Sequence, residues 1–134
     1  MSSGIWDQWW TKHLAVRAKP ADAIDEFWKI LIDELIEVVT EDGFVDFRDP
    51  ENIEAWVGPP WVTLELGRED HTVSARFWTQ RKDMSTKHLF DKTLRISEDK
   101  ADLADFRSGG LGSPAECGLV IGKFLFSLRT LEAQ

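Results

Sequence analysis

The residue types best suited to chemistry in this chain lie in the stretch REDH, in the middle of the sequence. Glu69, Asp70 and His71, joined by Asp83 or His88, are of the types that ligate metal ions or exchange protons in acid–base catalysis. Successive residues of a strand point to opposite faces, so the three neighbours do not converge by themselves. An exposed, charged hairpin turn explains them equally, and we predict neither a metal site nor catalytic residues.

Two further stretches carry weaker chemical signals. The loop SGGLGSP precedes a helix, and backbone N–H groups in such a loop can hold phosphate. It lacks the Lys-Ser/Thr of a phosphate-binding P-loop, so a flexible connection is favoured, and anion binding by residues 108–113 stays open. The single cysteine, Cys117, excludes an intramolecular disulfide, and its place on an apolar stripe favours a buried thiol. We expect no cofactor.

The charge of the chain is unevenly distributed. The net charge is −8, yet the segment from Asp22 to Glu54 alone carries twelve acidic and two basic residues. From Arg68 to Arg95 the balance reverses, with seven basic and four acidic residues. Net negative charge disfavours nucleic acids and anionic membranes and favours basic partners. We therefore expect a basic protein partner, and neither direct nucleic-acid binding nor membrane binding.

The acidic segment also contains aromatic side chains that could anchor a partner. Charge would steer the encounter and apolar contacts would hold the complex. The alternative interpretation is a solvated acidic surface above ordinary core aromatics. The predicted partner-binding residues are Asp22, Glu26, Asp33, Glu37, Glu41, Asp42, Phe44, Asp46, Phe47 and Trp56.

Three helices are predicted to position these residues. Trp6, Trp9 and Trp10 share one face of a helix over about residues 4–16, and we expect this face to pack in the core, an exposed interface being the alternative. The stretch AIDEFWKILIDELIEVV has a wide apolar arc opposite an acidic stripe, which predicts a central helix. Ser113 opens a capping box before the apolar C-terminal helix.

The middle of the chain is predicted to be mostly β. FVDF forms a short strand, WVTLELG and TVSARFWTQ alternate as a hairpin, and KHLFDKTLRI is a third meander strand. Short helices are expected after Asp49 and after Ser97, each of which resembles an N-cap. We expect one α+β domain over residues 1–134, in which a small antiparallel sheet of three to four strands packs with N-terminal and C-terminal helices.

The expected compartment and assembly follow from absent signals. The N-terminal residues show no basic stretch followed by an apolar run, and no apolar stretch is long enough to span a bilayer. We expect a cytoplasmic protein, either monomer or homodimer.

In size and acidity the chain resembles small bacterial inhibitors, namely immunity proteins that neutralise a toxin and phage inhibitors that imitate DNA. The resemblance implies a non-catalytic module that occludes a basic site on a toxin or nuclease. One alternative is a small enzyme or ligand-binding protein with a pocket between sheet and helices, walled by Trp61 and Trp78 with Arg76 as anion anchor. Another is an accessory or assembly subunit.

Overall fold

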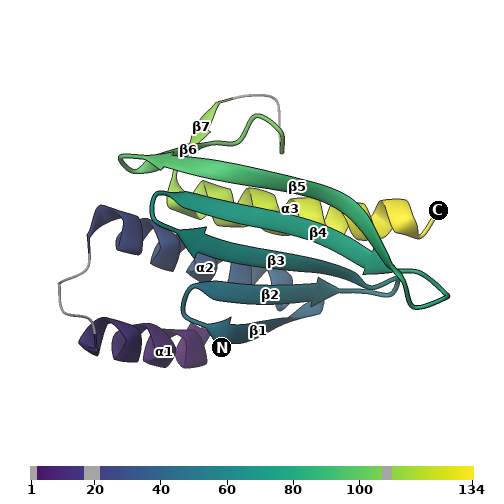
Figure 1. Ribbon diagram of the computed structural model, residues 1–134, viewed down its shortest axis with the longest axis horizontal. Coiled ribbons are helices and arrows are strands. Elements are labelled where there is room, and N and C mark those ends of the chain that lie inside the picture. The colour runs from purple at the N-terminus through teal and green to yellow at the C-terminus, as the bar shows by residue number, and fades with distance from the viewer. Residues whose placement is uncertain (1–2, 17–21, 107–109) are drawn as a thin grey trace.

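The computed structural model describes residues 3–16, 22–106 and 110–134, which form three helices and one seven-stranded antiparallel sheet in chain order (Figure 1). The helices are α1 (Ser3–Ala15), α2 (Ala23–Val39) and α3 (Pro114–Glu132). The strands are β1 (Gly43–Asp49), β2 (Asn52–Val57), β3 (Val62–Glu69), β4 (Thr72–Gln80), β5 (Thr86–Ser97), β6 (Lys100–Asp102) and β7 (Leu111–Gly112). The α+β class is confirmed, but the predicted sheet of three to four strands is wrong.

The sheet is larger than predicted partly because a segment expected to be helical is a strand. In β2, Ile53, Ala55 and Val57 are buried at alternate positions, which is the period of a strand. The Asp49 carboxylate caps no helix. It accepts a hydrogen bond from the backbone N–H of Glu51 (2.8 Å) and closes the turn between β1 and β2.

The second expected helix is also a turn and a strand. Ser97 ends β5 and pairs with Lys100 of β6, so it caps no helix. Glu98 between them has a φ of 60°, the left-handed conformation that a tight hairpin turn requires. Pairing of Ala101 with Gly112 then adds β7.

The other predicted elements are confirmed, and both central helices begin with a capping box. The Asp22 side chain accepts hydrogen bonds from the N–H groups of Ile24 and Asp25, and Asp25 accepts one from the N–H of Asp22 in return. Ser113 and Glu116 form the same reciprocal box at the start of α3.

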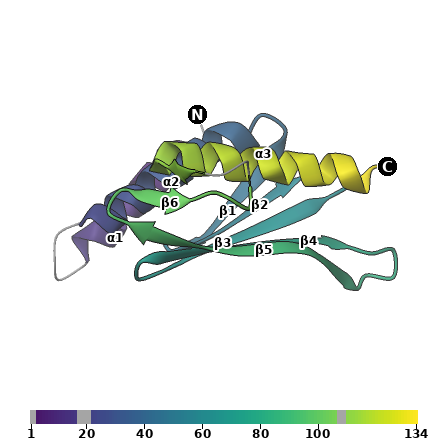
Figure 2. The ribbon, with the colours of Figure 1, turned by 90° about the horizontal axis from the view of Figure 1, so that it is seen from above.

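The helices cover one face of the sheet. Figure 2 shows α2 and α3 lying side by side along it, and no helix or strand in the described parts of the chain covers the other face. The core between these layers contains Phe27, Leu31 and Leu35 of α2 with Ile121 and Leu125 of α3, all essentially inaccessible to solvent. Alternate residues of β2–β5 form the sheet side of this core.

Two glycines allow the two central helices to approach closely. A Cβ on Gly118 would lie 2.3 Å from the backbone oxygen of Leu31, and one on Gly122 would lie 2.7 Å from a methyl group of Val38. The small-residue spacing in GLVIG therefore serves the packing of α3 against α2.

Helix α1 packs beside the edge strand β1 (Figure 1). Trp6 and Trp10 are buried, which confirms the predicted core packing of this face. The Trp6 ring stacks on Phe47 with centroids 5.7 Å apart, and Trp9 lies 6.3 Å from the same ring. Aromatic packing thus attaches α1 to an edge that would otherwise expose apolar surface.

Candidate functional site

The face of the sheet turned away from the helices, here called the open face, carries mostly polar and charged side chains. Strand alternation puts one set of side chains in the core and the next set on this face. The set includes Phe44, Asp46, Arg48, Asn52, Glu54, Trp56, Thr63, Glu65, Ser74, Arg76, Trp78, His88, Asp91 and Thr93.

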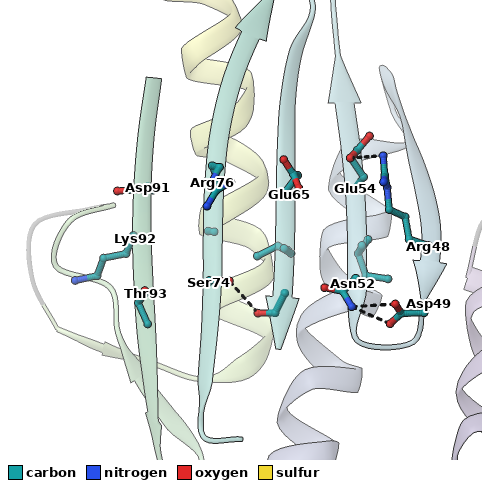
Figure 3. A pocket seen from close by; sticks show the side chains of 14 residues that line it. Arg48, Asp49, Asn52, Glu54, Glu65, Ser74, Arg76, Asp91, Lys92 and Thr93 are labelled. Carbon is teal, nitrogen blue, oxygen red and sulfur yellow. Dashed lines mark hydrogen bonds and ion pairs between the residues drawn. The ribbon is translucent and has the colours of Figure 1, made fainter. Parts of the chain in front are cut away.

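A row of charged residues crosses the open face from β1 to β5. Asp46, Glu54, Glu65, Arg76 and Asp91 stand directly opposite one another on successive strands, and we call them the charge row. Figure 3 shows the last four of these side chains in line across β2 to β5. Like charges at directly opposed positions repel, so the β1–β3 end of the row has a negative potential.

A single arginine offsets part of this repulsion. The Nη2 atom of Arg48 lies 2.8 Å from Oε2 of Glu54, as the dashed line in Figure 3 marks. The Glu54 side chain is 7% exposed, so this pair is shielded from water although Arg48 itself is exposed. Arg48 thus provides the counter-charge to a buried carboxylate.

The arginine within the charge row, Arg76, has no such partner among the described residues. Within the described residues no carboxylate lies within ion-pair distance of it, although Glu65 and Asp91 flank it on neighbouring strands. Glu65 instead accepts a hydrogen bond from the indole Nε1–H of Trp78 (3.0 Å), and Asp91 lies 3.5 Å from Nε2 of His88. The Arg76 guanidinium therefore faces solvent with its donors available.

Aromatic side chains lie beside the charge row on the same face. Phe44 pairs with Trp56 across β1 and β2, and Trp78 follows two strands further on. Trp61, next to β3, stacks on Phe44 with ring centroids 6.0 Å apart. Phe44 is 63% exposed and Trp61 49%, so this stacked pair is a solvent-facing apolar surface at one corner of the open face.

The open face is hollowed in two places that share residues. The larger hollow, about 740 Å³, extends from Arg48 on β1 to Thr93 on β5 and includes most of the charge row. The smaller, about 480 Å³, lies over β3–β5 between Glu65, Trp78 and His88. Both have Glu65, Arg76 and Asp91 in their walls. The space between sheet and helices, where the sequence suggested a pocket, is filled by core side chains.

The predicted partner-binding residues divide between the two sides of the molecule. Phe44, Asp46 and Trp56 come together on the open face, whereas Phe47 is half-buried against α1. Glu26, Asp33 and Glu37 lie along α2 in the helix layer, Asp22 caps that helix, and Glu41 and Asp42 occupy the following turn. The acidic segment therefore does not form one surface.

Basic side chains partly neutralise the acidic stripe of α2, which contains Glu26, Asp33 and Glu37. The ammonium group of Lys29 lies 2.5 Å from Asp33 and 2.7 Å from Asp7 of α1. Burial alone would lower the pKa of Lys29, but these two carboxylates together outweigh it and raise the pKa above 10.5. Asp42 similarly pairs with Arg129 of α3. The stripe is thus less negative than its sequence indicates.

Sequence reasoning missed Glu54, Glu65 and Asp91. Reading β2 as a helix hid Glu54, because only strand alternation puts it beside Asp46. Glu65 and Arg76 stand at the polar positions of the predicted hairpin, and that alternation is the signal that could have paired them.

The other chemical candidates of the sequence are the charged turn REDH with its neighbours, Cys117 and the glycine-rich loop. Among residues 3–16, 22–106 and 110–134, no three His, Cys, Asp or Glu side chains lie together in a way that could hold a metal ion. Cys117 is buried, with its Sγ 3.8 Å from the backbone oxygen of Gly112. Part of the glycine-rich loop, residues 107–109, lies outside the described residues, so anion binding there is not addressed.

In the part of the chain that the structure describes, none of the helices combines the length and the apolar character needed to cross a bilayer. Comparison with protein-family models, curated protein sequences and solved structures found nothing that matches this chain.

Proposed function

We propose that this protein is a non-catalytic binding module of the inhibitor type, which covers a basic site on a protein partner such as a toxin or nuclease. The contact surface is the open face of the sheet, from the Phe44–Trp61 pair to the charge row. The observation that carries the proposal is that stacked, solvent-facing aromatic rings adjoin a row of carboxylates on a sheet face bare of other described elements.

The charges of the larger hollow support a basic partner. Its walls and the adjoining charge row hold five carboxylates against two guanidinium groups, with Lys92 turned to Asp105 on the other side of the sheet. A concave surface with one dominant sign of charge concentrates field lines and attracts the opposite charge. A lysine-rich or arginine-rich segment therefore fits this hollow better than an acidic one.

Exposed aromatic rings favour the open face over the α2 stripe as the contact. Binding energy in protein interfaces concentrates in buried aromatic and arginine side chains surrounded by a polar rim. Phe44 and Trp61 supply such anchors, whereas the only exposed large apolar residue of α2 is Ile30, at 40% exposure, and one carboxylate of that helix, Asp33, is already paired with Lys29.

The test is affinity capture from the source cell at low salt, with variants that separate the two acidic surfaces. Phe44→Ser with Trp61→Ser alters the open-face anchors, and Asp46→Lys with Glu65→Lys reverses its charge. Glu26→Lys with Glu37→Lys is the matched control on α2. We expect capture of a basic protein that high salt releases, that both open-face variants lose, and that the α2 control retains.

Several outcomes would contradict the proposal. Capture of no salt-sensitive basic protein would exclude the partner class, and undiminished capture by both open-face variants would exclude the surface. Loss of the partner by the α2 control alone would move the contact to the helix layer. A captured acidic or neutral partner would instead favour an accessory or assembly subunit.

A ligand-binding function is the second candidate, and one observation favours it. The open face contains an unpaired guanidinium at the wall of a hollow the size of a small-molecule site.

A further inference from the structure

We propose that the smaller hollow, over β3–β5, binds a small zwitterion of the α-amino acid type. The walls are formed by Glu65, Arg76, Trp78, Thr86, His88 and Asp91. Its volume of about 480 Å³ falls within the range of 300–1,000 Å³ typical of small-ligand sites. The hollow shares Glu65, Arg76 and Asp91 with the proposed partner surface, but ligand binding there does not depend on a protein partner.

Arg76 is the group that would receive the carboxylate of the ligand. A guanidinium presents a planar fork of donors that matches a carboxylate in a bidentate hydrogen bond. Glu65, which lies opposite Arg76 on β3, accepts a hydrogen bond from the indole N–H of Trp78 instead. No described acidic side chain lies within ion-pair distance of Arg76. The cation is therefore held in a hollow without an internal counter-ion.

The flanking carboxylates decide what kind of ligand fits. Glu65 and Asp91 stand on either side of Arg76, each one strand away, which is about 5 Å. They repel a simple anion approaching Arg76, and Arg76 repels a simple cation approaching them. A molecule with a carboxylate and an ammonium group on the same carbon atom, as in an α-amino acid, satisfies both charges at once. The alternation of signs therefore selects a zwitterion.

Trp78 supplies a surface for the remaining part of the ligand. It lies two residues beyond Arg76 on the same face of β4, and its hydrogen bond to Glu65 fixes the edge of the indole, leaving its half-exposed ring against the hollow. Aromatic and aliphatic groups pack favourably on such a ring. We infer that the side chain of the amino acid is apolar.

The experiment uses three forms of one probe. L-phenylalanine carries both charges, N-acetyl-L-phenylalanine lacks the ammonium, and L-phenylalaninamide lacks the carboxylate; the same three forms of leucine replace the ring. Binding is followed by the NMR signal of the Trp78 indole N–H, assigned by its loss in Trp78→Phe. We expect saturable binding of the free amino acid, weakened about tenfold to a hundredfold in either blocked form.

Variants locate the site and control for general effects. Arg76→Met and Asp91→Asn should each weaken binding of free phenylalanine or leucine. Arg95→Met removes an exposed arginine further along the same face of the sheet, outside both hollows, and should leave binding unchanged. Native spectra of each variant verify the fold.

The opposite results would overturn the site. It is wrong if neither free amino acid moves the Trp78 signal up to its solubility limit, or if the three forms bind equally. Binding of the amide alone would show an acidic site instead of a zwitterion site, and undiminished binding by Arg76→Met would exclude Arg76. None of these measurements involves a protein partner, so their failure leaves the proposed inhibitor function to its own test.

Discussion

The two faces of the sheet can be compared within one strand, because consecutive residues of β4 point to opposite sides. Phe77 is fully buried and its ring lies 5.1 Å from that of Phe124 on α3, within a cluster that also contains Phe90 and Phe106. Trp78, the next residue, is half-exposed on the open face and bonded only at its edge to Glu65. Packing against the helices determines the residue types on the helix side of the sheet, whereas the open face carries charged side chains.

The same contrast appears between two arginines. Arg68 points to the helix side, where its side chain is 10% exposed and pairs with the fully buried Asp25 of α2. Arg76 is exposed on the open face and unpaired among the described side chains. The buried ion pair thus belongs to the helix side of the sheet, whereas the arginine of the open face remains accessible to solvent.

The largest expected difference is between Phe77→Ala and Trp78→Ala. Loss of the Phe77 ring leaves a cavity at the centre of the aromatic cluster and should lower the free energy of unfolding by about 3–5 kcal/mol. Trp78→Ala should lower it by about 1 kcal/mol, because its ring is half-exposed already. Urea denaturation measures both. Equal losses would mean that the open face also contributes to the packed core.

Substitution of Arg68 and of Arg76 is expected to give a somewhat smaller difference in stability. Arg68→Met leaves the Asp25 carboxylate buried without its cation and should cost about 3 kcal/mol. Arg76→Met breaks no ion pair among the described residues and should change stability by about 0.5 kcal/mol or less. Denaturation of the two variants under the same buffer conditions is the measurement. A large loss for Arg76→Met would show that the charge row is a structural network.

The smallest effect concerns the helix layer itself. Gly118→Ala places a methyl group 2.3 Å from the backbone oxygen of Leu31, so α2 and α3 must separate, at a cost of about 1–3 kcal/mol. Gly4→Ala on α1 is the matched control, since its new methyl group meets nothing within 4 Å and alanine favours helix by up to about 1 kcal/mol. Opposite shifts in Tm are expected. A raised Tm for both variants would mean that α2 and α3 can move apart at Gly118 with little loss of stability.

The sequence predicts the parts of this fold that local rules determine. The apolar arcs locate α2 and α3, the capping box at Ser113 locates the start of α3, and strand alternation locates β3 and β4. Asp49 and Ser97 were misread because a residue whose side chain closes a turn resembles a residue that begins a helix. Only the pairing of the following strands distinguishes the two.

The candidate site was less predictable than the fold, since it depends on register between strands. Glu54, Glu65 and Asp91 are distant in sequence and meet only through cross-strand pairing. The acidic segment gave the correct sign of charge for part of the open face. The sequence alone does not show that the acidic residues of α2 lie on the opposite side of the molecule from the open face.

The order in which the strands join has a consequence for biosynthesis. Each strand pairs with the one made just before it, so the sheet can assemble hairpin by hairpin as the chain emerges. The helix α3, which covers the apolar side of β2 and β3 and packs on α2, is synthesised after every strand. Until it arrives, that half of the core faces water, and the nascent chain depends on rapid completion or on chaperones to avoid aggregation.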